Sequence, residues 1–325
     1  MSQTSREQDA RVAVLIPCYN EAITIAKVVT DVRRVLPSAR IIVCDNNSTD
    51  DTARIAAEAG AQVVTEPRQG KGNVLRSLFR NVEADCYAII DGDDTYAVDQ
   101  LPRMTDMVLN DGVDMVIGDR ISASYLEVNK RPYHNFGNLL MRSLINRLFK
   151  SSVPDILSGL RAFSPLFVKN FPILSQGFEI ETEMTIYALD NNFVVRSIPV
   201  GYNNRPKGST SKLNTFSDGF KVIRKVFTLF IHFKPLLFFS ILSGILFLAG
   251  AIGMIPVFVE YFSTGLVPRF PTLIVCGFVI LLSLLLLVSG LILEVANTRH
   301  KQLVEVLMNK KCPRRSPGGW HGRAH

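Results

Sequence analysis

Residues 86–94 read CYAIIDGDD, an apolar run that ends abruptly in acidic residues. The apolar half is typical of a short strand buried on both faces of a sheet. Asp91, Asp93 and Asp94 follow at once, around a glycine. Carboxylates at alternate positions past a strand end can converge on one hard cation, but an acidic cluster with glycine is also a common turn. The surrounding sequence has to distinguish these two interpretations.

Similar apolar runs lie on both sides of this stretch. Further strand candidates are residues 12–16, 41–44, 62–65 and 115–117. The segments between them carry apolar residues at helical spacing, at residues 25–36, 52–59 and 74–82. Strands that alternate with helices predict an α/β domain with a mostly parallel sheet covered on both faces. Ligands bind such sheets at the carboxyl ends of the strands, where the polar clusters of this chain also lie.

Two long uncharged segments follow, residues 235–259 and 271–293. At about 1.5 Å per residue, each can cross the roughly 30 Å of hydrocarbon in a bilayer. A buried core helix is the alternative, but two such runs joined by a short connector favour a transmembrane hairpin. Basic residues gather on both flanks, which places both flanks in the cytoplasm and the connector outside. They are Lys221, Arg224, Lys225 and Lys234 before the hairpin, and Arg299, Lys301, Lys310, Lys311, Arg314 and Arg315 after it.

Composition divides the chain into five parts. A polar tail at residues 1–11 lacks the apolar core of a signal peptide, so we expect the domain at residues 12–212 to stay in the cytosol. Residues 213–234 carry apolar residues at helical spacing between basic ones, which predicts a helix in the membrane interface; an ordinary packing helix is the alternative. The hairpin region, residues 235–298, and a basic tail, residues 299–325, complete the chain.

The net charge of +7 suits phosphate-bearing substrates, anionic lipid or nucleic acid, and does not choose among them. The five cysteines are odd in number and have no CxxC spacing, which indicates buried, reduced thiols and argues against a zinc site. The segment QGKG at residues 69–72 lacks the spacing of a nucleoside triphosphatase loop.

Three motifs follow successive strands in order: IPCYNE at residues 16–21, DNNSTD at residues 45–50 and DGD at residues 91–93. Together they resemble family 2 glycosyltransferases with the GT-A fold. Later motifs are similar to the dolichol-phosphate mannose synthase branch, and the resemblance covers residues 12–212. These are Gly118-Asp119-Arg120, Asp155 with Ser158-Gly159, Gly177-Phe178 with Glu183, and Arg205 with Gly208 and Ser211-Lys212. The hairpin resembles the anchor of bacterial polyprenyl-phosphate glycosyltransferases.

The resemblance implies a role for each matching residue. Asp91 and Asp93 would bind Mg²⁺ or Mn²⁺, with Asp93 the more direct ligand. The catalytic pocket would contain Asp93, Asp155, Glu183 and Arg120. The nucleotide sugar would contact Pro17, Tyr19, Glu21, Asp45, Lys71, Asp91, Arg205, Ser211 and Lys212. The acceptor phosphate would meet Arg120, Arg131, His134 and Asn138.

Two positions depart from the family pattern or fit it loosely. Asn46 stands where related enzymes often have a second acidic residue after the second strand. The segment RPYHNFGN at residues 131–138 matches the acceptor region of the mannose synthases only in outline. A solvated turn is the alternative for Lys71, a surface pair for Glu179 with Glu183, and a structural histidine for His134.

The implied reaction moves a hexosyl group from a nucleotide sugar to a polyprenyl phosphate at the cytoplasmic face of the cell (inner) membrane. A phosphate monoester has a second pKa of about 6, so it can attack the sugar without a general base. UDP-glucose is the favoured donor, with GDP-mannose and UDP-N-acetylglucosamine as alternatives. A processive polysaccharide synthase and a non-catalytic membrane scaffold are the rival functions. No nucleic-acid partner is expected, and a homo-oligomer is left open.

Overall fold

The computed structural model describes residues 11–121, 132–175, 177, 179–203, 228, 230–231 and 233–311. They belong to two compact units: an α/β unit within residues 1–219, and a helical unit within residues 220–310. The predicted interfacial helix lies almost entirely outside the described residues.

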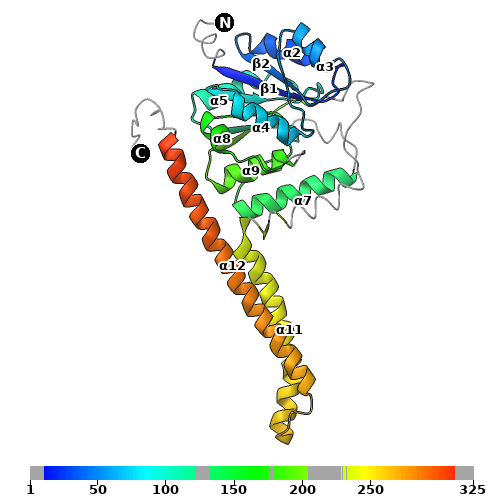
Figure 1. Cartoon of the computed structure of the whole chain (residues 1–325), viewed down its shortest axis with the longest axis vertical. Helices are drawn as coiled ribbons and strands as arrows, with labels where there is room; N and C mark the ends of the chain where they lie inside the picture. The colour runs from blue at the N-terminus through cyan, green and yellow to red at the C-terminus, as the bar shows by residue number, and fades with distance from the viewer. Residues whose placement is uncertain are drawn as a thin grey trace. The chain divides into compact units, whose positions relative to one another are not determined.

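The strands of the α/β unit are β1 (Val12–Cys18), β2 (Arg40–Asp45), β3 (Gln62–Thr65), β4 (Cys86–Ile89), β5 (Met115–Asp119), β6 (Arg161–Phe163) and β7 (Val195–Pro199). Its helices are α2 (Ile25–Val35), α3 (Thr52–Glu58), α4 (Lys71–Asn81), α5 (Leu101–Leu109), α7 (Pro132–Phe149), α8 (Pro165–Asn170) and α9 (Ile180–Asp190). Figure 1 shows these helices packed around the sheet.

Among the described residues, the strands form one seven-stranded sheet in the order β3-β2-β1-β4-β6-β5-β7. The prediction of a mostly parallel sheet is confirmed, since β1 pairs in parallel with both β2 and β4, and β5 with β7. The sequence did not predict β6, which runs antiparallel to both β4 and β5. Because β6 has three residues and begins with an arginine, it lacks the apolar run that marked the other strands.

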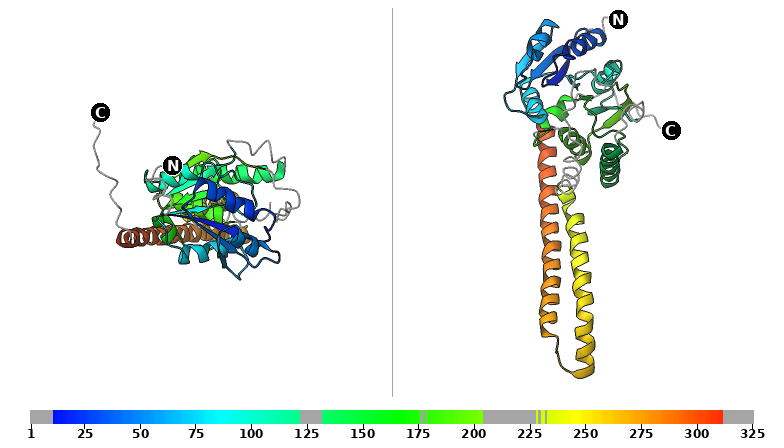
Figure 2. Two further views of the ribbon diagram at one scale, coloured as in Figure 1. Left: turned by 90° about the horizontal axis from the view of Figure 1, so that it is seen from above. Right: turned by 90° about the vertical axis from the view of Figure 1, so that its right-hand side faces the viewer.

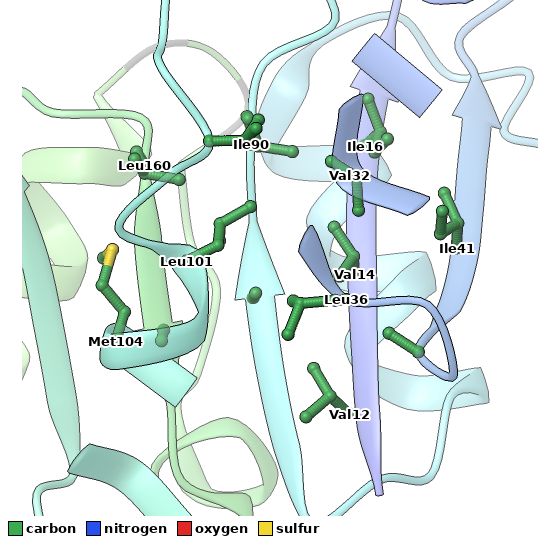
Figure 3. Close-up of a cluster of buried hydrophobic side chains, with 14 of the residues drawn as sticks. Val12, Val14, Ile16, Val32, Leu36, Ile41, Ile90, Leu101, Met104 and Leu160 are labelled. Atoms are coloured by element: carbon green, nitrogen blue, oxygen red, sulfur yellow. The ribbon is translucent and has the colours of Figure 1, made fainter. Parts of the chain in front are cut away.

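One face of the sheet carries a core of aliphatic side chains. Alternate residues of β1, Val12, Val14 and Ile16, point to this face, as the two-residue period of a strand requires. Figure 3 shows them beside Val32 of α2 and Leu101 of α5. The strand is buried on both faces, and the polar loop after Cys18 begins at its carboxyl end.

The opposite face is built from aromatic side chains. Phe163 of β6 stacks on Phe167 of α8, with ring centroids 4.9 Å apart, and Phe79 of α4 meets Phe163 edge to face at 6.1 Å. Tyr187 of α9 contacts Phe167 at 5.8 Å. These contacts attach α4, α8 and α9 to the same side of the sheet, and they thereby position the first residues of α4 and α9.

Four described cysteines, Cys18, Cys44, Cys86 and Cys276, are buried and free, which confirms the predicted thiols at these positions. Burial raises the pKa of the Cys18 thiol, and nearby carboxylates, Glu21 first, raise it further.

The helical unit is an antiparallel pair, α11 (Pro235–Thr264) and α12 (Phe270–Lys311), shown side by side in Figures 1 and 2. Both are long and apolar enough to cross a membrane, and only 11% and 17% of their most apolar windows are buried. Ser243 donates to the carbonyl oxygen of Ser283 at 2.7 Å, and a Cβ at Gly250 would crowd Ile280. Small residues thus allow the helices to approach closely, while the large apolar side chains point outward, an arrangement typical of membrane helices.

Candidate active site

The loops after β1 and β2 are tied together at the carboxyl end of the sheet. The backbone N–H of Glu21 donates to Thr52 Oγ1 at 2.8 Å, and that of Asn20 donates to Ser48 Oγ at 2.9 Å. Asp45, at the end of β2, is 6% exposed. Its Oδ2 accepts from the Ser48 N–H at 3.2 Å, whereas its Oδ1 is buried without a hydrogen-bond partner. Buried polar atoms are rarely left unpaired, so this oxygen points to a ligand contact. Pro17, near the end of β1, and Tyr19, in the loop that follows, are both partly exposed.

Asn46 organises the neighbouring loop. Its side-chain amide donates to the carbonyl oxygens of Glu66 and Arg68, both at 2.8 Å, and its Oδ1 accepts from the Gly70 N–H at 2.7 Å. A carboxylate could not donate these two hydrogen bonds. The departure from the family pattern at this position therefore has a structural consequence: Asn46 fixes the loop that leads into Lys71.

The loop after β4 presents the acidic motif. Asp93 is 6% exposed, and its Oδ1 accepts from the backbone N–H of Thr95 at 3.2 Å and from its hydroxyl at 2.6 Å. Gly92 lies so close to Cys18 that a Cβ would come within 2.6 Å of its sulfur. A Cβ at Gly159 would overlap the Asp91 carboxylate. Both glycines are therefore needed for this loop to adopt its conformation.

These two carboxylates suit a divalent cation that is shared with a substrate. No group of three or more His, Cys, Asp or Glu side chains suitable for a metal occurs among the described residues. Mg²⁺ is commonly bound by one or two carboxylates together with substrate phosphates and water. Asp91 and Asp93 therefore fit a metal that a substrate diphosphate also binds.

Lys71 links Asp91 to a second buried acid. Its Nζ lies 2.5 Å from Asp91 Oδ1 and 2.6 Å from Glu181 Oε1, and its side chain is 9% exposed. Burial alone would lower the pKa of Lys71, but the charges of Asp91 and Glu181 outweigh it and raise the pKa. The solvated turn that the sequence left open for Lys71 is therefore wrong, because the ammonium group is buried between two carboxylates.

Arg120 and Asp155 form a second charged pair. Arg120 Nε donates to Asp155 Oδ2 at 2.7 Å and Nη2 donates to Oδ1 at 3.0 Å, a bidentate arrangement. The guanidinium lies over the rings of Tyr96 and Tyr202, at 5.8 and 5.4 Å from their centroids. Burial raises the pKa of Tyr96, whose hydroxyl oxygen accepts from the Gly159 N–H at 2.7 Å. Gly159 thus lies close both to Tyr96, whose ring the Arg120 guanidinium covers, and to the Asp91 carboxylate.

Arg161 holds the loop that contains Asp155 through hydrogen bonds to the loop backbone. Its guanidinium is fully buried and donates to the carbonyl oxygens of Ser158 and Ile156, at 2.9 and 2.6 Å, and to Thr185 Oγ1 at 2.9 Å. Burial lowers the pKa of Arg161 to about 10. The sequence analysis did not identify this residue, because a single arginine in a short strand carries no periodic signal.

Glu183 lies apart from these groups. Its Oε1 and Oε2 accept from the backbone N–H groups of Leu174 and Ser175, each at 2.9 Å. Both oxygens therefore hold the segment that precedes α9. Glu181, two residues earlier, is the acid that Lys71 joins to Asp91. The sequence did not single it out, because the family motif pointed to Glu183.

The remaining predicted residues fall outside what the structure describes. Arg131, Arg205, Ser211 and Lys212 lie in undescribed segments. His134 and Asn138 belong to helix α7, but the structure does not describe their side chains.

Comparison with known proteins agrees with this architecture. The family model described as glycosyl transferase family 2 matches residues 13–169. Glycosyltransferase AglJ of Haloferax volcanii is 34% identical over 230 residues, which cover 70% of this chain and 75% of that protein. The chain therefore belongs to glycosyltransferase family 2. A dolichyl-phosphate hexose transferase of the same organism is 28% identical over 207 residues, which cover 64% of this chain and 88% of that protein.

A solved structure supports the GT-A fold. It is glucosyl-3-phosphoglycerate synthase from Mycobacterium tuberculosis in complex with Mn²⁺, UDP and phosphoglyceric acid. The TM-score is 0.52 at 22% identity, and the match covers 71% of this chain and 82% of that one.

Proposed function

We propose that this protein transfers a hexosyl group from a nucleotide sugar to a polyprenyl phosphate at the cytoplasmic face of the cell membrane. The observation that carries the proposal is the combination of two features in one chain. A family 2 α/β unit gathers charged side chains at the carboxyl end of its sheet, and a hairpin of exposed apolar helices follows it. The similarity to a dolichyl-phosphate hexose transferase supports a lipid acceptor.

Each charged group has a place in this reaction. The buried, unpaired oxygen of Asp45 accepts a hydrogen bond from the nucleoside, beside Pro17, Tyr19 and Glu21. Asp91 and Asp93 hold Mg²⁺ or Mn²⁺, which when bound neutralises the charge of the departing diphosphate. The Mn²⁺ and UDP in the similar synthase structure support this assignment.

Arg120 orients the acceptor. Asp155 and two tyrosine rings fix its guanidinium, so the group is pre-organised for a phosphate oxygen. A dianionic phosphate needs no general base, and the site works by positioning and charge neutralisation. Attack opposite the leaving nucleotide inverts the anomeric centre. Arg131, His134 and Asn138 remain proposed phosphate contacts, Arg205, Ser211 and Lys212 proposed diphosphate contacts, and Glu183 a proposed pocket residue.

Two rival functions have less support. Processive synthases usually carry a Gln-x-x-Arg-Trp motif, whereas the only tryptophan of this chain is Trp320. A non-catalytic scaffold would have no need for the charged arrangement around Asp91 and Asp93.

A transfer assay separates these functions. The purified full-length protein is mixed with Mn²⁺, a short polyprenyl phosphate, and radiolabelled UDP-glucose, UDP-N-acetylglucosamine or GDP-mannose in parallel. We expect a single labelled polyprenyl-phosphate sugar with one of the donors, UDP-glucose being favoured. A labelled polymer would indicate the processive synthase, and no product with any donor would indicate the scaffold. A donor that binds the folded state also raises the melting temperature, which identifies it independently.

Arg120→Lys is expected to lower kcat/KM for the polyprenyl phosphate by about 10- to 100-fold, because the substitution removes a charge-assisted bidentate contact. Lysine keeps the charge but cannot form the bidentate contact with Asp155 or place a planar guanidinium over the two tyrosine rings. Nucleotide-sugar affinity should be unchanged. Steady-state kinetics with each substrate varied in turn measure the two effects, and Arg34→Lys, in an exposed pair 3.4 Å from Asp99, is the matched control. An equal loss for both substrates would contradict the acceptor assignment.

The proposed topology makes a separate prediction. A cysteine reporter in the connector at residues 266–269 should react with an impermeant reagent on intact cells. The basic flanks keep the start of α11 and the end of α12 in the cytoplasm, so the connector lies outside. Reporters at residues 2 and 325 should react only after the cells are opened. Labelling of the N-terminal reporter on intact cells would overturn the hairpin orientation.

A further inference from the structure

Glu181 is a buried carboxylate that the fold leaves half satisfied. It lies in the first turn of α9 and is 5% exposed. Oε1 accepts from Lys71 Nζ at 2.6 Å, while Oε2 is buried without a hydrogen-bond partner. In the described part of the α/β unit, the other side-chain oxygen that is buried without a hydrogen-bond partner is Asp45 Oδ1. An acceptor buried and unpaired is costly, so both oxygens point to hydrogen bonds made only when a ligand is bound.

The position of Glu181 indicates which part of the ligand it meets. Lys71 bridges Glu181 to Asp91, at 2.6 and 2.5 Å, and so places Glu181 beside the carboxylate assigned to the diphosphate and its metal. Asp45 is the last residue of β2. In the sheet, β1 lies between β2 and β4, and β4 leads into Asp91. A nucleotide sugar with its nucleoside at Asp45 and its diphosphate at Asp91 carries its hexose directly after the diphosphate, and Glu181 is the buried acid that Lys71 joins to Asp91.

The chemistry of the free oxygen restricts its partner. Two cations already act on Glu181: Lys71, which it shares with Asp91, and the buried Arg161, whose pKa the charge of Glu181 raises. A neutral hydrogen-bond donor therefore suits Oε2 better than a further cation. The phosphates of a nucleotide sugar carry no donor at neutral pH, whereas the hexose carries several hydroxyl groups. The Lys71 ion pair also fixes the carboxylate in place, so its second oxygen is aimed before the ligand arrives.

We propose that Glu181 Oε2 accepts a hydrogen bond from one hydroxyl of the donor hexose and thereby selects the sugar. The inference rests on the proposed function and adds the residue that reads the sugar. A buried site that is built to hydrogen-bond a substrate hydroxyl strongly rejects an analogue without it, because the acceptor is then left unpaired. A purely structural Glu181, present only to neutralise Lys71, would show no such discrimination.

A double-substitution cycle between protein and ligand tests the proposal. Isothermal titration of the full-length protein uses UDP, UDP-glucose and the four UDP-glucose analogues with fluorine in place of the hydroxyl at carbon 2, 3, 4 or 6. We expect one analogue to bind the native protein about 10- to 100-fold more weakly than UDP-glucose. Glu181→Gln should bind UDP-glucose more weakly by a similar factor, bind UDP normally, and show little further loss with that one analogue.

Glu179→Gln is the matched control, because Glu179 is an exposed acid at the start of the same helix. Glu181→Asp is a second variant that keeps the charge beside Lys71 but withdraws the carboxylate by one methylene. It should weaken UDP-glucose binding and leave UDP binding unchanged, and it serves if Glu181→Gln fails to fold.

The outcomes are distinguishable. If the losses from Glu181→Gln and from every analogue simply add, Glu181 makes no sugar contact and the inference is overturned. If UDP binding falls as much as UDP-glucose binding, Glu181 only supports Lys71 and the inference is again overturned. If the native protein binds and transfers none of the screened nucleotide sugars, the proposed function itself has failed. Should the transfer assay select GDP-mannose or UDP-N-acetylglucosamine, the fluorinated series of that donor replaces the glucose series.

Discussion

Asp93→Asn is expected to abolish sugar transfer, with a loss of about 10³-fold or more, while the protein stays folded. The substitution removes one negative charge from the pair of carboxylates proposed to hold the metal, and a metal there would stabilise the departing diphosphate by several kcal/mol. The asparagine Oδ1 can still accept from the Thr95 N–H and hydroxyl, which preserves the loop. Initial rates over a Mn²⁺ titration and a thermal unfolding curve measure the two expectations.

The adjacent acid provides the control. Asp94 Oδ1 pairs with Lys27 at 2.6 Å, and its backbone φ of 59° is one that asparagine adopts readily. Asp94→Asn removes the same charge one residue away and should keep most of the activity. If Asp93→Asn works at a near-normal rate in saturating metal, or if both variants lose activity equally, Asp93 is not the metal ligand.

Deletion of everything after Lys212 is expected to leave a soluble domain that binds the nucleotide sugar but turns over long-chain polyprenyl phosphate at least about 100-fold more slowly. The α/β unit is compact by itself and contains the charged groups around Asp91. The deleted part contains the apolar hairpin, which in the proposed topology keeps the enzyme at the membrane and so raises its effective concentration toward the lipid. Lys221, Arg224 and Lys225 would add roughly 1 kcal/mol each near an anionic surface.

Two lipids of different length make this test specific. The truncated domain should use a short, water-soluble polyprenyl phosphate far better than the long-chain lipid, whereas the full chain should use the long-chain lipid in bilayers efficiently. Nucleotide-sugar affinity, measured by titration, should agree between the two proteins. Equal rates on long-chain lipid in bilayers would mean that the hairpin and the basic segment do not position the site.

Much of the architecture follows from local patterns. The apolar runs of β1 and β4 indicate strands buried on both faces, and the helical spacing in α2 and α4 indicates one buried face on each helix; the structure agrees with these predictions. Hydropathy alone located both long apolar helices, although α12 continues as a helix to Lys311, well past the predicted span. The strands that were missed are short or weakly patterned: β6 has three residues, and β7 is partly exposed. Helices α5 and α7 were not predicted either.

The sequence by itself determined the α/β class, the apolar hairpin and the acidic loop at Asp91 and Asp93, because each depends on residues that are close along the chain. Tertiary structure alone decided that Lys71 meets Glu181, which is 110 residues away, and that Glu183 binds backbone instead. Both acids lie in the first turn of α9, and their charges are identical in the sequence. Which of them faces the site depends on how the aromatic contacts orient α9 against the sheet, and no local pattern records that orientation.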